Sequence, residues 1–391
     1  MKVAKLLIPG EFEDAFLYRG WLIAVTVNRT VDVYDFRHMV SSVGSTLSQG
    51  DSFLPMLFLR NEWLHGAQFN AFMSNADVYS TFCSFFDDLP SPIEVVESQG
   101  FIHHREPIGI DSRAILDLNI YNDRLFLGLD KGCFQQDFHW SSRAFAPKMA
   151  MAKRFDARCF GITTGFGALN LSCGDEGLFS SSDVFDWDAR INPTHAVERI
   201  AGASLRSAWL HDDLMNYSNG AKPELHRGHS TEKKSKAKKL VEVYRDQIPL
   251  DDLFSKMKNE YHVTDDDVQF SFNSNDRMFV HTYDGRFFGI EVVWKKGDVP
   301  RPKLTTTYKG ENSRILSAGF CHTGTAIETE RRVFLFAKGL WHPLLDEEVI
   351  SLRTFPDQRQ LANTVLAVTE AGIFVISTFD DTEFARRRQQ Q

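Results

Sequence analysis

The chain has 391 residues, 43% of them hydrophobic and 25% charged, and a formal net charge of -8. This composition is typical of a globular protein with a large core, and the acidic balance excludes a protein that coats nucleic acid with its whole surface. Five scattered cysteines, an odd number with no CxxC pair, indicate a reduced, cytoplasmic setting without structural disulfides.

The first predicted element is an apolar strand, KVAKLLI (2–8), which has no partner strand next to it in the sequence. The apolar stretch at this end is too short for a signal peptide. The most apolar early run, FLPMLFL (53–59), is far below bilayer-spanning length and contains Pro55. We therefore expect no membrane span.

A strand–turn–strand phrase then recurs along the chain. Examples are RLFLGLDKGCF (124–134) and VLAVTEAGIFV (365–375), each with two apolar runs around a tight turn that carries an acid and a glycine. The glycine supplies the positive φ that a tight hairpin needs. The equivalent turn positions are Gly132, Gly177, Gly220, Gly285, Arg332 and Gly372. Their spacing of roughly 40–50 residues, with one longer step from 220 to 285, is typical of propeller blades.

Each unit reads as strand a, a turn, strand b, the acid-x-Gly turn and strand c. A fourth strand d follows, most clearly in RVFLFAKGLWHPLL (332–345). Eight a–b–c units can be counted, near 12–36, 53–86, 113–138, 157–187, 202–227, 267–294, 314–341 and 350–379. The second fits the pattern least well, so seven blades with an irregular insertion stay open as an alternative.

The two ends of the chain complement each other. After the last strand c (372–378) only a polar segment follows, and we expect residues 380–391 to be a flexible tail. Residues 2–8 would then supply strand d beside 372–378, which removes two exposed sheet edges. The prediction is an all-β fold: one domain over residues 1–391, a closed β-propeller of seven or eight four-stranded blades, with the N-terminal strand closing the last blade.

These repeats resemble β-propeller repeats in general, including those of WD-repeat proteins, over nearly the whole chain. No specific family is indicated, because regular Gly-His openings and Trp-Asp endings are missing. The acid-x-Gly turns also resemble fragments of the Asp-box of sialidase-type propellers, but CGDEGLF and GLDKGCF lack the Ser or Thr in register.

The acids of the b–c turns would all lie on one rim of such a propeller. They are Asp130, Asp175, Asp284, Glu330 and Glu370. One interpretation is a carboxylate ring that binds a cation or a basic partner. The other is structural, because Asp and Asn stabilise tight turns by bonding to their own backbone.

Metal and cofactor sites are not indicated. His103 and His104 are neighbours on a predicted strand, so they point to opposite faces and cannot share a metal. No Cys/His set has zinc spacing. Cys159 and Cys173 fall across one a–b hairpin, where buried free thiols are expected. We expect no catalytic residue, no metal and no cofactor.

The most unusual segment is HRGHSTEKKSKAKKLVEVYRD (226–246), inside the longest step between turn glycines. With the helical pattern of 249–263 after it, it predicts a blade insertion over 226–262, a basic loop plus a short helix. The strands 222–227 and 241–246 would be c and d, so the lysines would lie on a c–d connection. Together with 295–297 and 338–339 they would make that rim basic and the opposite, b–c rim acidic. The candidate partner-binding residues are Arg227, Lys233, Lys234, Lys236, Lys238 and Lys239.

The lysine run fits contact with an acidic protein surface or with phosphates, and equally a solvated loop. We predict a non-catalytic protein-interaction or scaffold protein, an accessory subunit of a cytoplasmic multiprotein complex that binds protein partners through its rims. One alternative is a propeller enzyme of the hydrolase or lyase type with a site in the central funnel. Another is a nucleic-acid-binding accessory subunit that uses residues 226–246.

Overall fold

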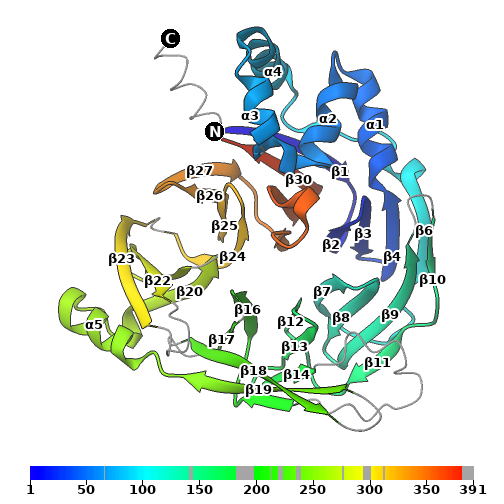
Figure 1. Cartoon of the computed structure of the whole chain (residues 1–391). Helices are drawn as coiled ribbons and strands as arrows, with labels where there is room; N and C mark the ends of the chain where they lie inside the picture. The colour runs from blue at the N-terminus through cyan, green and yellow to red at the C-terminus, as the bar shows by residue number, and fades with distance from the viewer. Residues whose placement is uncertain are drawn as a thin grey trace. The chain divides into compact units, whose positions relative to one another are not determined.

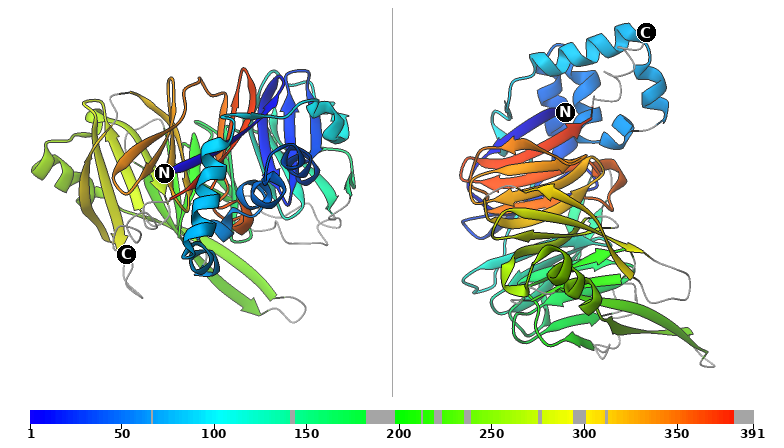
Figure 2. Two further views of the ribbon diagram at one scale, coloured as in Figure 1. Left: turned by 90° about the horizontal axis from the view of Figure 1, so that it is seen from above. Right: turned by 90° about the vertical axis from the view of Figure 1, so that its left-hand side faces the viewer.

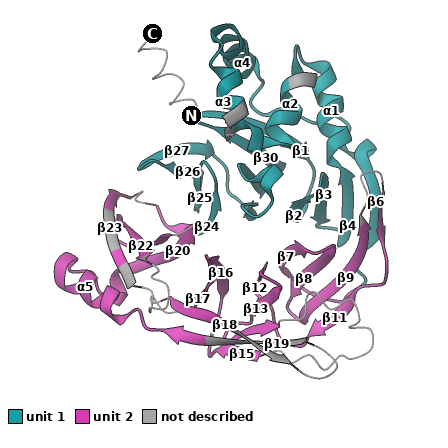
Figure 3. Cartoon of the chain, viewed as in Figure 1, with its two compact units in different colours: residues 1–109, 316–391 teal, residues 110–315 magenta. Residues whose placement is uncertain are grey.

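The computed structural model describes residues 1–65, 67–140, 144–181, 198–211, 213–218, 223–234, 239–274, 277–293, 301–310 and 313–380. Two compact units make up the chain, residues 1–109 with 316–391 and residues 110–315 (Figure 3). No helix among the described residues is both long and apolar enough to cross a membrane. The predicted C-terminal tail lies almost wholly outside the described residues.

The first unit holds three sheets and four helices (Figure 1). One sheet has the order β2 (Phe12–Tyr18), β3 (Trp21–Thr26), β4 (Thr30–Asp35), β6 (Ile102–Pro107). Another has the order β24 (Ile315–Cys321), β25 (Gly324–Thr329), β26 (Val333–Ala337), β27 (Leu340–Leu345). The third has the order β28 (Ser351–Thr354), β29 (Thr364–Thr369), β30 (Gly372–Phe379), β1 (Lys2–Pro9), β5 (Ile93–Glu94).

The second unit holds four sheets and one helix, α5 (Asp251–Tyr261). The first two sheets contain β7 (Ile115–Tyr121), β8 (Arg124–Leu129), β9 (Gly132–Trp140), β10 (Phe145–Pro147) with β11 (Ala152–Phe155), and β12 (Gly161–Gly165), β13 (Ala168–Ser172), β14 (Leu178–Ser181), β15 (Glu198–Ala201). The other two contain β16 (Arg206–Leu210), β17 (Asp213–Tyr217), β18 (Glu224–Lys234), β19 (Lys239–Ile248), and β20 (Val268–Ser274), β21 (Arg277–Thr282), β22 (Arg286–Val293), β23 (Arg301–Lys309).

These seven sheets of the described residues repeat one arrangement, in which strands a, b, c and d lie side by side in that order. In six of them the four strands also follow each other in the sequence, and in the last the N-terminal β1 supplies strand d. This confirms the predicted propeller blades and sets their number at seven. The middle strands are buried along their whole length in β3, β29 and β30, as near-continuous apolar runs must be when both faces of a sheet are covered. Closure of the blades into one ring, and one domain over the whole chain, stay predictions.

The N-terminal strand completes the last blade, as predicted. β1 pairs antiparallel with β30 from Lys2 opposite Phe379 to Pro9 opposite Gly372 (Figure 1). The side chains of Leu6 and Ile8 are fully buried in this sheet. Gly372 has φ +140°, and a Cβ atom there would overlap the carbonyl oxygen of Ile8. The glycine of this turn is therefore required by its φ and also by the close approach of the N-terminal strand.

The predicted blade at 53–86 is wrong, because this segment is helical. The chain between β4 and β6 forms α1 (Phe36–Thr46), α2 (Gly50–Phe58), α3 (Ala67–Met73) and α4 (Ala76–Asp88). α4 begins at Asn75, whose side chain accepts hydrogen bonds from the backbone N–H groups of Asp77 (2.9 Å) and Val78 (3.3 Å). Its buried residues follow a helical period: Tyr79, Phe82, Phe85 and Phe86. The insertion is thus a c–d connection of the first blade.

The helical insertion packs on the last blade within the first unit. The ring of Phe379, at the end of β30, lies 5.7 Å from that of Phe69, 5.5 Å from that of Phe82 and 6.4 Å from that of Phe86 (centroid distances). Asn61 donates from Nδ2 to Thr364 Oγ1 at 2.6 Å. The abundant phenylalanine of this segment therefore fills a helix–sheet interface.

Each strand a lies at the edge of its own sheet, and polar side chains connect it to the next blade. In the second unit, Asp117 accepts from the N–H of Ile162 at 2.6 Å, and Asn119 donates to the carbonyl oxygen of Ile162 at 3.0 Å. Asn273 on β20 donates from Nδ2 to the carbonyl oxygen of Trp209 on β16 at 2.5 Å. These side chains satisfy backbone groups that the sheet leaves unpaired.

In the first unit a buried ion pair joins the first and last blades. Asp14 on β2 accepts from Nε of Arg353 at 2.9 Å and from the hydroxyl of Ser351 at 2.6 Å, both on β28. Gln358 donates to the carbonyl oxygen of Leu17 at 2.8 Å. Adjacent blades within each unit are thus joined through their innermost strands.

Truncation of the N-terminal strand tests its role in the last blade. We expect Leu6→Ala to lower the free energy of unfolding by about 3 kcal/mol, because it leaves a cavity in a fully buried position. Lys5→Ala, in the same strand, should change it by less than about 0.5 kcal/mol. Deletion of residues 1–9 should expose the edge of β30 and promote aggregation. Urea unfolding and light scattering measure both effects, and a deletion variant with unchanged melting and solubility would contradict them.

Removal of one blade connection tests the second principle of the fold. Asn273→Ala leaves the carbonyl oxygen of Trp209 without this partner, so we expect a loss of about 1–3 kcal/mol in the free energy of unfolding. Gln360→Ala, at an exposed position outside the sheets, is the control and should be neutral. Equal urea midpoints for both variants would show that the connection contributes nothing to stability.

Candidate partner-binding site

The predicted lysine segment forms most of a long β-hairpin in the second unit. β18 and β19 pair over ten positions, from Leu225 opposite Ile248 to Lys234 opposite Lys239. The strands extend further toward the lysines than the sequence predicts, so Lys233, Lys234 and Lys239 belong to the two strands of the hairpin. Lys236 and Lys238 lie outside the described residues. Figure 2 shows the green hairpin extending beyond the other strands of its unit.

Arg227, the sixth predicted binding residue, lies at the other end of the hairpin. Its Nε is 3.7 Å from a carboxylate oxygen of Asp213 on β17. At the rise of an extended strand, six residues place Arg227 about 20 Å from Lys233. The structure therefore brings the three described lysines together but separates Arg227 from them.

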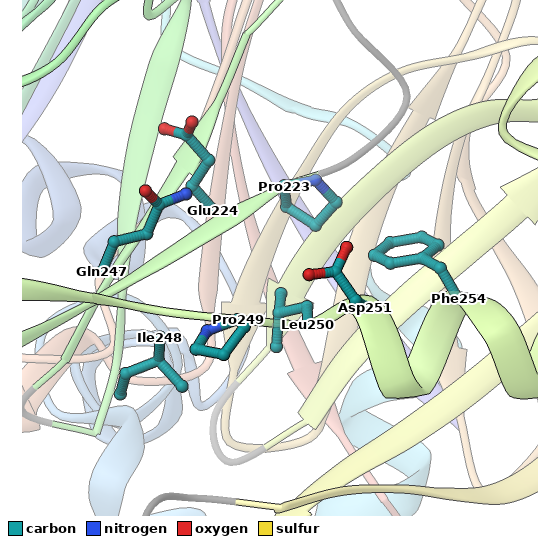
Figure 4. A pocket seen from close by; sticks show the side chains of 8 residues that line it. All are labelled: Pro223, Glu224, Gln247, Ile248, Pro249, Leu250, Asp251 and Phe254. Atoms are coloured by element: carbon teal, nitrogen blue, oxygen red, sulfur yellow. The ribbon is translucent and has the colours of Figure 1, made fainter.

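A cleft of about 410 Å³ lies at the base of the same hairpin, where β18 starts, β19 ends and α5 begins (Figure 4). Its lining residues are Pro223, Glu224, Gln247, Ile248, Pro249, Leu250, Asp251 and Phe254. The sequence analysis missed this cleft. Its only local signal is that a proline is followed closely by an acid at both 223–224 and 249–252.

The floor of the cleft is apolar and firmly packed. Ile248, Leu250 and Phe254 are each at most 8% exposed. They belong to one core cluster that also contains Leu253 and Met257, the other buried residues of α5. The buried side of α5 is the one that the sequence spacing indicates. A well-packed floor keeps the cleft preformed.

Two carboxylates stand at the cleft. Glu224 accepts from Nδ2 of Asn216 at 2.8 Å through Oε2, and this oxygen is 3.4 Å from Nε2 of His226. Asp251 is in the first turn of α5, where a negative charge is favourable to the helix dipole. Among the described residues, Asp251 makes no side-chain hydrogen bond or ion pair. None of the lining residues is basic.

Two acids of the b–c turns make structural contacts: Asp284 with its own turn, and Asp130 with the segment before strand a of its blade. Asp284 accepts from Thr282 Oγ1 at 2.5 Å and from Arg286 Nε at 2.8 Å. Asp130 accepts from the hydroxyl of Ser112 and from the backbone N–H of Arg113. Hydrogen bonds from Arg286 and Thr282 lower the pKa of Asp284 to about 2. At these two turns the structural interpretation of the acids is supported.

The histidines and cysteines flagged in the sequence do not converge on a reactive site among the described residues. His103 is exposed on β6, whereas His104 is partly buried, with Nε2 3.4 Å from a carboxylate oxygen of Glu106. Cys133, Cys159 and Cys173 share one apolar cluster, all as free thiols. Hydrogen bonding with Cys133, together with burial, raises the pKa of Cys159. A protonated buried thiol is a poor nucleophile.

Comparisons with known proteins support the fold. No protein-family model matches the chain, and no curated protein matches its sequence. Among similar solved structures, the β-propeller domain of Cps50 (Swd1) from Myceliophteria thermophila has a TM-score of 0.51 and 10% sequence identity, over 94% of this chain and 97% of that one.

Two further structures are similar at lower scores. BBS1N in complex with ARL6DN has a TM-score of 0.48 and 9% identity, over 98% of this chain and 97% of that one. YCF48 bound to D1 peptide has a TM-score of 0.48 and 7% identity, over 97% of this chain and 96% of that one. At 10% identity the likeness to the Cps50 (Swd1) domain shows the fold alone. Together with the seven sheets of the described residues, that likeness establishes a β-propeller of seven blades.

The role of the turn acids is testable through pH. Because the pKa of Asp284 is lowered in the folded state, its stabilising effect is present above the unfolded pKa of about 4 and is lost as the pH falls toward 2. Asp284→Asn should therefore flatten the loss of stability between about pH 4 and pH 2. Glu370→Gln, in the corresponding turn of another blade, should leave that part of the curve unchanged. Urea midpoints measured from pH 7 to pH 2 show whether the carboxylate of Asp284 stabilises its turn.

Proposed function

We propose that this protein is a non-catalytic interaction or scaffold protein that acts as an accessory subunit of a cytoplasmic multiprotein complex. In this proposal the lysine hairpin of β18 and β19 binds an acidic surface of a protein partner. The observation that carries the proposal is the hairpin itself, a long extension whose strands include Lys233, Lys234 and Lys239, in a protein whose net charge is -8.

The hairpin is built in a way that favours an anionic partner. Lys234 and Lys239 are at directly opposite positions of the two strands. Like charges at opposite positions destabilise a strand pair, and a bound carboxylate or phosphate offsets that repulsion. The lysines are also remote from the packed base of the hairpin, so they contribute little to the core.

A protein partner is favoured over nucleic acid by what surrounds the lysines. Binding to single-stranded nucleic acid combines a basic groove with aromatic side chains on which bases stack. The run from Thr231 to Leu240 has no aromatic residue. A catalytic role lacks support as well, because the described histidines and cysteines form no reactive constellation.

Two defined polyanions test this proposal: a fluorescein-labelled 20-residue polyglutamate peptide and a labelled 20-nucleotide single-stranded DNA. We expect the peptide to bind, and binding to weaken steeply between 50 and 200 mM salt as counterions are released. Replacement of Lys233, Lys234, Lys236, Lys238 and Lys239 by Ala should weaken binding of the peptide by about tenfold or more at 100 mM salt, as measured by fluorescence anisotropy.

The matched control removes the same number of positive charges from a different element. Lys233→Ala with Lys234→Ala should reduce binding of the peptide, whereas Lys256→Ala with Lys258→Ala, on the neighbouring helix α5, should not. Thermal melting should be the same for both double variants. Equal binding by the quintuple variant and the wild type would contradict the proposal, and a clear preference for the DNA would support the nucleic-acid alternative instead.

A further inference from the structure

We propose that the cleft at the base of the hairpin binds a lysine or arginine side chain from an extended segment of a partner protein. The cleft is the one lined by Glu224, Asp251 and the apolar floor described above (Figure 4). This inference does not rest on the proposed function of the lysines, because it concerns other residues, at the opposite end of the hairpin, and a ligand of opposite charge.

The size and walls of the cleft fit one long side chain. A volume of about 410 Å³ is at the lower end of the range for small-ligand pockets. Ile248, Leu250 and Phe254 form a buried apolar floor. Lysine and arginine carry aliphatic stems that pack on such a surface while the charged head stays at a polar edge.

The charge of the cleft selects a cation. The two ionisable side chains among its lining residues are the carboxylates of Glu224 and Asp251. Asp251 has no side-chain partner among the described residues, and Glu224 contacts Asn216 and His226 through Oε2. Pro223 and Pro249 have no backbone N–H, so these two walls offer no donor to an anion. Asp251 and Phe254 both line the cleft from α5 (Figure 4), and a carboxylate and an aromatic ring are groups that an arginine head contacts well.

An organic cation fits better than a metal ion. Ca²⁺ requires six to eight oxygen ligands, and Mg²⁺ a near-ideal octahedron. The cleft provides two carboxylates on different elements, and the described residues contain no cluster of acids, histidines and cysteines suited to a metal. A guanidinium or ammonium group needs only one or two carboxylates and can keep water on its other donors.

An extended partner segment is favoured over a free amino acid because apolar surface continues beside the charges. Pro249 and Leu250 also line the cleft, so we expect the residue next to the basic one to pack against them. The ligand class is therefore a basic residue followed by an apolar one, in a chain without regular structure.

The test uses two dipeptides that differ only in charge, N-acetyl-Arg-Leu-amide and N-acetyl-citrulline-Leu-amide. Saturation-transfer NMR with the full chain measures their binding, since affinities in the millimolar range are sufficient for it. We expect the arginine peptide to bind about tenfold more tightly than the citrulline peptide, because citrulline keeps the shape and loses the charge. Binding should also weaken as salt is raised.

Variants of the chain locate the site. Asp251→Asn and Glu224→Gln should each weaken binding of the arginine peptide about five- to tenfold. Asp252→Asn removes the same charge from the same helical turn but does not line the cleft, so it should have no effect. Thermal melting of all three variants confirms that the fold is kept.

Three outcomes would overturn the inference: equal binding of the two peptides, equal effects of Asp251→Asn and Asp252→Asn, or no binding of either peptide. The quintuple lysine variant keeps the two proposals separate. If it binds the arginine peptide like the wild type, the cleft acts independently of the hairpin lysines. Failure of polyglutamate binding alone leaves the cleft proposal standing.

Discussion

The structure depends on how the innermost strand of each blade satisfies its free edge. Strand a is the edge of its own sheet, so half of its backbone groups lack a partner there. Side chains such as Asn273, Asp117 and Asn119 replace the missing strand by bonding to the backbone of the neighbouring blade. In the first unit Asp14 joins two blades differently, through a side-chain partner, Arg353. Because of these contacts, the connections next to the innermost strands cannot easily be lengthened.

The opposite end of each sheet is less constrained, and two extensions of the described chain occur there. The helical segment from α1 to α4 lies between strands c and d of the first blade, and the extended hairpin is formed by strands c and d of the fourth. A c–d connection can lengthen because strand d is the outermost strand of its blade. Lengthening it moves no residue of the a–b pair, on which the contacts between blades depend. Surface features for binding are therefore expected at this connection.

The sequence predicted most of the fold because its signals are local. A tight turn with glycine between two apolar runs specifies a hairpin whatever surrounds it, and the turns at Gly132, Gly177, Gly285 and Gly372 all have positive φ. The lone N-terminal strand and the unfilled edge of the last blade could also be matched by their patterns alone.

The prediction of a blade at 53–86 was wrong because short, phenylalanine-rich runs suit a buried helix as well as a strand. What distinguishes them here is the spacing of Tyr79, Phe82 and Phe86 together with the cap at Asn75, a signal of helical period that the repeat count overrode. The cleft could not be predicted for another reason. Its lining comes from residues 223–224 and 247–254, which only the register of the hairpin brings together.

The hairpin thus connects two candidate surfaces of opposite charge, lysines at one end and carboxylates at the other. Its ten residue pairs separate them by roughly 30 Å at the rise of a β-strand. A partner with an acidic patch and a basic residue at that separation can bind in one direction only, because the reversed pose places like charges against each other. Complementary charge of this kind contributes more to specificity than to affinity. The rigidity of a continuously paired hairpin is what fixes the separation, so the strand pairing that extends β18 and β19 beyond their blade is itself part of the recognition that we propose.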